Sequence, residues 1–199
     1  MTTLDDAALT ATLCDLLQLE HDTLPAYGLA LLGLRDEERR ARLAAFRDEH
    51  RRHVAELSDL IRARGGWPLP LPHLPTGPLK LALQAAGLPG GERAVLLAFR
   101  ANEWQSREKY AKAAAAAEEA ADPAAPDVAA VLRRAAADEA AHYAWAVESL
   151  EELGLGDDTP VGMANGAFAR VHGLVAEGIE SVGRAGLTAL MRLPRPRAR

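Results

Sequence analysis

The 199-residue chain has little of the residues that build β-sheets, disulfide frameworks and membrane spans. Its one cysteine, Cys14, cannot form an internal disulfide, and we expect it to be a small helix residue rather than a reactive thiol. Valine and isoleucine, which favour strands, are sparse, and aromatic residues make up only 5%. There is no apolar run of about 18 residues or more, so no transmembrane helix is expected. These scarcities together favour an all-α protein.

Acidic residues outnumber basic ones, with 28 Asp and Glu against 23 Lys and Arg. The net charge of −5 argues against nucleic-acid binding and against a DNA-protecting shell, both of which need a basic surface. The exception is the tail 192–199, which carries four arginines. The first residues, Met-Thr-Thr-Leu-Asp-Asp, are acidic, unlike the positively charged start of a signal peptide, so a cytoplasmic location is expected.

Alanine and leucine, the strongest helix formers, supply most of the apolar residues and recur at helical spacing. The spacing predicts long helices over 4–34, 37–64, 91–121 and 127–153, with Asp36 capping the second and Pro25 interrupting the first. A connection at 65–90, rich in proline and glycine, holds a short helix at 79–87. A further amphipathic helix is predicted over 163–192, with Phe168 and four Val or Ile residues on one face. We expected this face to pack on the rest of the chain or on a dimer mate.

Each long helix places ionisable residues in the middle of its apolar stripe. The inward-facing candidates are Glu20 and Tyr27, His50 and His53, Glu103 and Tyr110, and Glu139 and His142. Residues three apart share a helix face, so each of the pairs His50/His53 and Glu139/His142 can reach one point.

The pattern occurs twice along the chain. Glu20 and Tyr27 are seven residues apart, as are Glu103 and Tyr110, and each such helix precedes one with a pair of candidate ligands three apart. Three glutamates and three histidines in a core need a compensating charge, because burying unpaired carboxylates costs several kcal/mol. Two divalent iron or manganese ions would suit these oxygen and imidazole groups. The predicted ligands are Glu20, His50, His53, Glu103, Glu139 and His142, with Glu20 and Glu103 as candidate bridges and Tyr27 and Tyr110 beside the ligands.

A metal-free interpretation stays open at this point. Glu–His hydrogen bonds could hold such a core together, or His50 and His53 could lie at its rim, paired with Asp48 and Glu49. The two tyrosines are expected to be core residues whose hydroxyls reach a carboxylate.

Residues from about 8 to 153 resemble the ferritin-like superfamily, in which two helices each give a Glu and two each give Glu-x-x-His. The matching positions are Glu20, Glu103, Glu139-Ala140-Ala141-His142, and His53 for the second helix. The segments Leu19-Glu20-His21-Asp22 and Asn102-Glu103 look closer still to small, largely uncharacterised bacterial ferritin-like bundles. The resemblance implies an antiparallel four-helix bundle with a long crossover, to which this chain adds a C-terminal helix. One departure is His50, which stands where the family has a glutamate.

These observations divide the chain into a bundle, 1–153, and a C-terminal helix with a basic tail, 154–199. The favoured function is a di-metal protein that handles O₂ or peroxide, as an oxidase or ferroxidase. Because only three carboxylates remain, simple metal binding ranks above fast iron oxidation and mineral storage. The alternative is a metal-free helical module that docks on a partner or an anionic membrane through the C-terminal helix. A homo-oligomer is compatible with either function.

Overall fold

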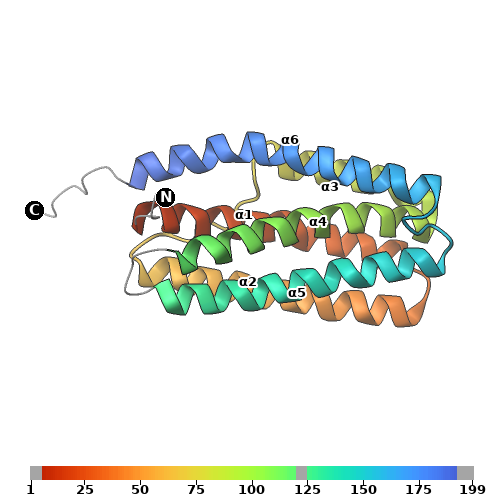
Figure 1. Ribbon diagram of the computed structural model, residues 1–199, viewed down its shortest axis with the longest axis horizontal. Helices are drawn as coiled ribbons and strands as arrows, with labels where there is room; N and C mark the ends of the chain where they lie inside the picture. Colours follow the sequence, from red (N-terminus) through yellow and green to blue (C-terminus); the bar gives the residue numbers. More distant parts are fainter. Residues whose placement is uncertain (1–5, 120–124, 192–199) are drawn as a thin grey trace, which may run out of the picture.

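The computed structural model describes residues 6–119 and 125–191, which form helices joined by short turns and one longer connection (Figure 1). The long helices are α1 (Asp6–Gly33), α2 (Glu37–Ala63), α4 (Gly91–Glu118), α5 (Ala125–Glu152) and α6 (Pro160–Met191). A short helix, α3 (Thr76–Gly87), and a single 3₁₀ turn, η1 (Leu88–Gly90), lie within the connection from α2 to α4. The described residues contain no strand, which confirms the all-helical prediction.

The helix boundaries fall close to those that the sequence predicts. The Asp36 carboxylate accepts a hydrogen bond of 2.8 Å from the backbone N–H of Arg39, so Asp36 caps α2 as expected. Gly65 and Gly154 adopt a left-handed backbone just after α2 and α5, a conformation that glycine enters without a side-chain penalty. Pro25 lies inside α1, which continues through it, and the kink expected at this residue stays a prediction.

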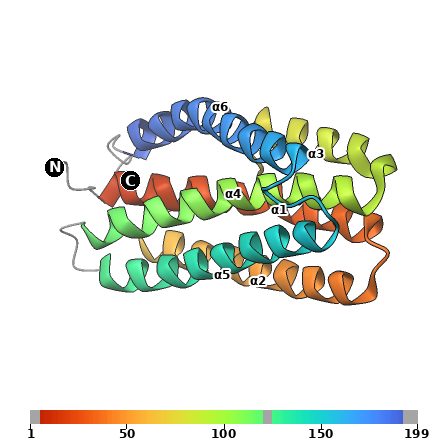
Figure 2. The ribbon, with the colours of Figure 1, turned by 45° about the vertical axis from the view of Figure 1, so that its right-hand side comes forward.

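The four helices α1, α2, α4 and α5 lie side by side and surround a common interior, whereas α3 and α6 lie outside α1 and α4 (Figures 1 and 2). The interior holds two clusters of buried apolar residues, one towards each end of these four helices. One contains Leu13, Leu57 and Leu132, and the other contains Phe46, Phe99 and Leu150. On all four helices the predicted ligands fall between the two clusters in sequence, so the polar site has apolar packing on both sides.

Helix α6 packs on α1 and α4 along nearly the whole length of the molecule (Figure 1). The predicted division into 1–153 and 154–199 remains a prediction, which a truncation can test. Within the described part of the chain, no helix is both long enough and apolar enough to cross a membrane.

Candidate metal centre

The structure brings all six predicted ligands together in the interior. Each of Glu20, His50, His53, Glu103, Glu139 and His142 is 0–1% exposed. They come from all four central helices, which explains why residues more than 100 positions apart can meet. The rim position considered for His50 and His53 is therefore not observed.

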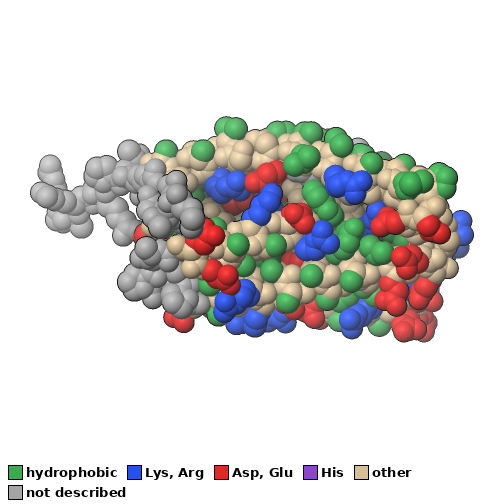
Figure 3. Space-filling view, in the orientation of Figure 1, with side chains coloured by type: hydrophobic (Ala, Val, Ile, Leu, Met, Phe, Trp, Pro, Cys, Tyr) green, Lys and Arg blue, Asp and Glu red, His purple; other side chains and the backbone are tan. Residues whose placement is uncertain are grey.

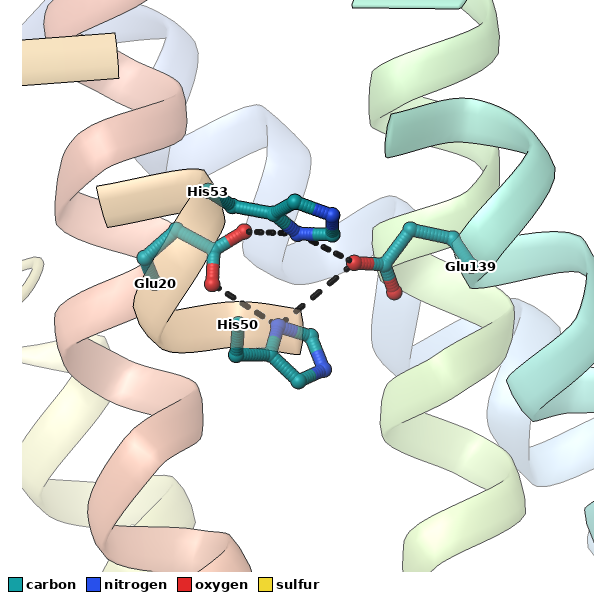
Figure 4. Close-up of side chains that lie close together, drawn as sticks. All are labelled: Glu20, His50, His53 and Glu139. Atoms are coloured by element: carbon teal, nitrogen blue, oxygen red, sulfur yellow. Dashed lines mark hydrogen bonds and ion pairs between the residues drawn. The ribbon is translucent and has the colours of Figure 1, made fainter. Parts of the chain in front are cut away.

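Two overlapping groups of potential ligands form this cluster. The first group is Glu20, His50, His53 and Glu139, each offering an atom within 4.8 Å of the others (Figure 4). His50 Nδ1 lies 2.8 Å from Glu20 Oε2 and 3.5 Å from Glu139 Oε1. His53 Nδ1 lies 3.4 Å from both Glu20 Oε1 and Glu139 Oε1. The four side chains thus point at one small volume between α1, α2 and α5.

The second group is His50, Glu103, Glu139 and His142. His142 Nδ1 lies 3.4 Å from Glu103 Oε2 and 3.8 Å from Glu139 Oε2. Glu139 belongs to both groups, and its two oxygens face different groups, whereas Glu20 and Glu103 belong to one group each. His50 also belongs to both groups, but only Glu139 directs one carboxylate oxygen to each. The predicted bridging role of Glu20 and Glu103 stays a prediction.

The two tyrosines bond across the helix pairs in matching ways. The Tyr27 hydroxyl on α1 donates to Glu103 Oε1 on α4 at 3.2 Å, and the Tyr110 hydroxyl on α4 donates to Glu20 Oε1 on α1 at 2.5 Å. Tyr27 also lies 3.0 Å from His50 Nε2 and 3.5 Å from His142 Nδ1. Burial raises the pKa of both phenols well above the usual value, and neighbouring carboxylates add to the effect, so both phenols keep their protons. The hydroxyls reach carboxylates, as the sequence predicted.

Two further carboxylates, Asp138 and Glu49, orient the histidines from outside the cluster. Asp138 Oδ2 lies 3.0 Å from His53 Nε2, and Glu49 Oε2 lies 2.6 Å from His142 Nε2. Because a carboxylate only accepts, each contact keeps a proton on Nε2 and leaves Nδ1 to face the interior. The spacing of the sequence does not predict this role for either residue. The available signal was their place directly before Glu139 and His50, on the flank of the inward face.

Without a metal, protons balance the charge of the site. Burial opposes a charge on the His53 imidazole, but its contacts with Glu139 and Glu20 outweigh burial and raise its pKa to about 10. Burial opposes a charge on His142 in the same way, yet Glu103 and Glu139 raise its pKa to about 11. Any cation that enters therefore competes with protons for Nδ1 of both histidines.

A second polar cluster lies between α1, α3, α4 and α6 and was not foreseen. The His73 ring bridges two carboxylates of α1, with Nδ1 2.9 Å from Asp22 Oδ2 and Nε2 3.1 Å from Asp15 Oδ1. Lys109 Nζ joins Asp15 Oδ2 at 3.1 Å to Glu180 Oε2 at 2.5 Å. Although Asp22, His73 and Glu180 could geometrically hold an ion, Lys109 and Lys80 already supply positive charge to Glu180. The ion pairs and hydrogen bonds of this cluster therefore hold α6, and the connection between α2 and α4, against the central helices.

Comparison of the chain with protein-family models, curated proteins and solved structures finds no match.

Proposed function

We propose that this protein binds two divalent metal ions, iron or manganese, between α1, α2, α4 and α5, as a four-helix carboxylate–histidine protein of the ferritin-like type. The bound pair would react with O₂ or peroxide, which makes an oxidase or peroxide-handling activity the favoured chemistry. A cytoplasmic location remains part of this prediction.

The observation that supports the proposal is a set of buried polar atoms without a hydrogen-bond partner. Both oxygens of Glu139, Oε2 of Glu103 and Nδ1 of His53 lack one, although all three residues are at most 1% exposed. Such atoms are rare in folded proteins. Here each keeps only ion-pair contacts of 3.4–3.8 Å within the cluster, which are longer than a normal hydrogen bond. These four atoms all belong to the two groups of converging ligands, where a cation would satisfy them together.

The ligand residues fit two metal positions that differ in their number of ligands. Glu20, His50 and His53 with Glu139 Oε1 would hold one ion, and Glu103 and His142 with Glu139 Oε2 would hold the other. Mixed oxygen and imidazole ligands suit iron and manganese. Three carboxylates carry too little negative charge to balance two trivalent ions, so the site favours the divalent state and ranks metal binding above mineral storage.

A small cavity adjoins the second position. A cavity of about 20 Å³ lies between α1, α3 and α4, has Ala30, Val95 and Phe99 in its wall, and extends to Tyr27 and Glu103. That volume is enough for about one water-sized molecule. When bound, the metal ions would supply electrons to O₂ or peroxide. The Tyr27 hydroxyl lies within 3.5 Å of three of the proposed ligands, where it can donate a hydrogen bond to a small oxygen species while keeping its proton.

Metal stoichiometry tests the proposal. After anaerobic equilibration with Mn²⁺ or Fe²⁺, elemental analysis should find two ions per parent chain. Glu20→Gln and Glu103→Gln should each leave one ion, and Glu139→Gln should weaken both positions. Asp138→Asn should weaken binding by about 10- to 100-fold, the usual effect of losing a carboxylate that orients a histidine ligand.

Glu148→Gln is the matched control, because Glu148 is an exposed carboxylate on the same helix as Glu139. It should retain two ions. A parent chain that takes up no metal, or Glu20 and Glu103 variants that keep both ions, would refute the proposal.

The metal-free docking module remains the second candidate function. The observation that favours it is the exposed apolar face of α6, which needs no metal to bind a partner. Metal uptake by the parent chain would separate the two functions, since docking alone predicts none.

A further inference from the structure

Helix α6 turns its apolar face away from the rest of the molecule. Large apolar side chains along this face are 48–73% exposed: Val161, Met163, Phe168, Val171, Leu174, Val175, Ile179 and Val182. Hydrophobic side chains accordingly line the edge of the molecule that α6 forms (Figure 3). Soluble proteins rarely leave a contiguous apolar patch of more than a few hundred Å² open unless it binds something.

The charged residues of α6 explain this orientation. Of four charged side chains in Pro160–Met191, three point towards α1 and α4. Glu180 is 4% exposed and bonds to Lys109 and Lys80, while Arg184 bonds to Asp15 at 2.8 Å and to Glu177. Because this ionic contact fixes which way the helix faces, the apolar face points outward. Of the two packing partners expected for it, the rest of the chain is excluded and a dimer mate is still open.

The exposed face has the seven-residue repeat of a coiled coil. One row of the repeat is mostly large: Val161, Phe168, Val175, Val182 and Ala189. The alternate row is mostly small: Ala164, Val171, Gly178 and Ala185. All nine positions are exposed and none is charged. A sustained 3.5-residue apolar period is the pattern by which one helix pairs with another.

We propose that α6 pairs with α6 of a second copy of this chain, in antiparallel orientation about a twofold axis. In an antiparallel pair the large row of one helix faces the small row of the other, so the face is complementary to itself. One register places Phe168 against Gly178 of the partner subunit and Val182 against Ala164 of the partner subunit. Gly178 fits this role because a Cβ built there would meet no atom within 4 Å, which leaves room for the partner's ring.

The composition of this face indicates that its binding partner is another helix and not a lipid surface. Membrane-surface helices usually combine bulky anchors with lysine or arginine along their polar side. Here the outward face carries Arg170 as its one charged residue among those described, and its row of β-branched residues alternates with glycine and alanine. From Val161 to Val182 the strip is about 33 Å long and about 10 Å wide. The resulting area of about 330 Å² matches the largest apolar patch of many monomers, which is often functional.

The oligomeric state of the full chain tests the pairing. Light scattering after size exclusion should find a dimer for the parent and a monomer for Val175→Glu, which places a charge in the middle of the strip. Leu32→Glu is the matched control, because Leu32 is a single apolar side chain, 79% exposed, on α1. It should remain a dimer. Both substituted residues are exposed, so unchanged circular dichroism should show that each variant folds.

A spin-label distance tests whether the two α6 helices are antiparallel. A spin label on a cysteine introduced by Gly183→Cys should lie about 30 Å along the helix axis from its twin in the antiparallel pair, and within roughly 10–15 Å in a parallel one. Cys14 is buried and should not react. A monomeric parent, a dimer that survives Val175→Glu, or a short label distance would overturn the proposal. So would a monomeric parent that floats with phosphatidylserine vesicles, which would assign the face to a membrane.

Discussion

Removing one half of the cluster should change both metal-dependent and metal-free stability. The double variant Glu103→Leu, His142→Leu deletes two ligands of the second group and leaves Glu20, His50, His53 and Glu139 in place. It should therefore bind one ion instead of two.

The magnitude follows from mass action. At a free metal concentration of 100 times Kd, each occupied site adds about 2.7 kcal/mol to the free energy of unfolding. Two sites add about 5.4 kcal/mol, and each kcal/mol raises Tm by about 2–4 °C in a chain of this size. Mn²⁺ should thus raise the Tm of the parent by about 11–22 °C and that of the double variant by about half as much.

The metal-free double variant should be as stable as the metal-free parent or more so. Glu103 and His142 are fully buried, and Glu103 Oε2 has no hydrogen-bond partner. Replacing buried ionic groups by apolar ones of similar size is often neutral or stabilising by about 1–4 kcal/mol. Glu49 would lose its contact with His142, but it is a third exposed and can turn to water.

The assay is thermal unfolding by circular dichroism, in EDTA and in Mn²⁺, for both proteins. The complementary variant Glu20→Leu, His53→Leu should also show half the parental shift, and the combination of all four substitutions should show almost none. Equal metal-induced shifts in the parent and the double variant, or no shift in the parent, would refute the assignment of these residues as ligands.

Three further predictions concern protons and α6. Burial raises the pKa of Glu180, but Lys109, Lys80 and His73 outweigh burial and lower it from 4.5 to about 2. The carboxylate thus stabilises the fold above pH 4.5 and loses this effect as pH falls towards 2, so acid-induced unfolding should be steep there and shallower in Glu180→Gln. Metal binding at neutral pH should release protons from His53 and His142, measured as a calorimetric heat that changes with the ionisation enthalpy of the buffer; a buffer-independent heat would contradict the pKa values. A chain ending at Gly156 should keep cooperative unfolding and helical dichroism at a lower Tm, because Asp15 and Lys109 lose their α6 partners. Precipitation of that chain, or a Tm far below that of the parent, would show that the predicted division at 153/154 is wrong.

Much of the site was predictable because helical periodicity is a local property. Glu20, Glu103 and Glu139 interrupt apolar stripes at fixed spacing, so the sequence alone indicates that they face inward. The match between the two halves of the chain adds that these positions lie at one level. The bonding of Tyr27 to Glu103 and of Tyr110 to Glu20 follows the same repeat.

The contacts of Glu49 and Asp138 with the histidines were harder to predict, because each carboxylate and its histidine partner lie on different helices. Glu49 contacts His142 on α5, and Asp138 contacts His53 on α2. The spacing of residues within one helix does not determine which residue of a neighbouring helix will contact a given side chain. The His73 cluster was hard to predict for the same reason, because one residue of an irregular connection contacts two helices, α1 and α6.

The sequence by itself determined where the helices run and which face of each one is apolar, because propensity, capping and periodicity act within a few residues. Only the tertiary structure decided what each face meets. For the four central helices the apolar face turns inward, as burial of apolar surface demands. For α6 the contacts of Glu180 and Arg184 with buried charges on α1, α3 and α4 hold the polar face inward instead. Leaving a buried charge without a partner costs more free energy than leaving one apolar strip exposed to water. A strip that is exposed in one chain can still be buried against a second chain.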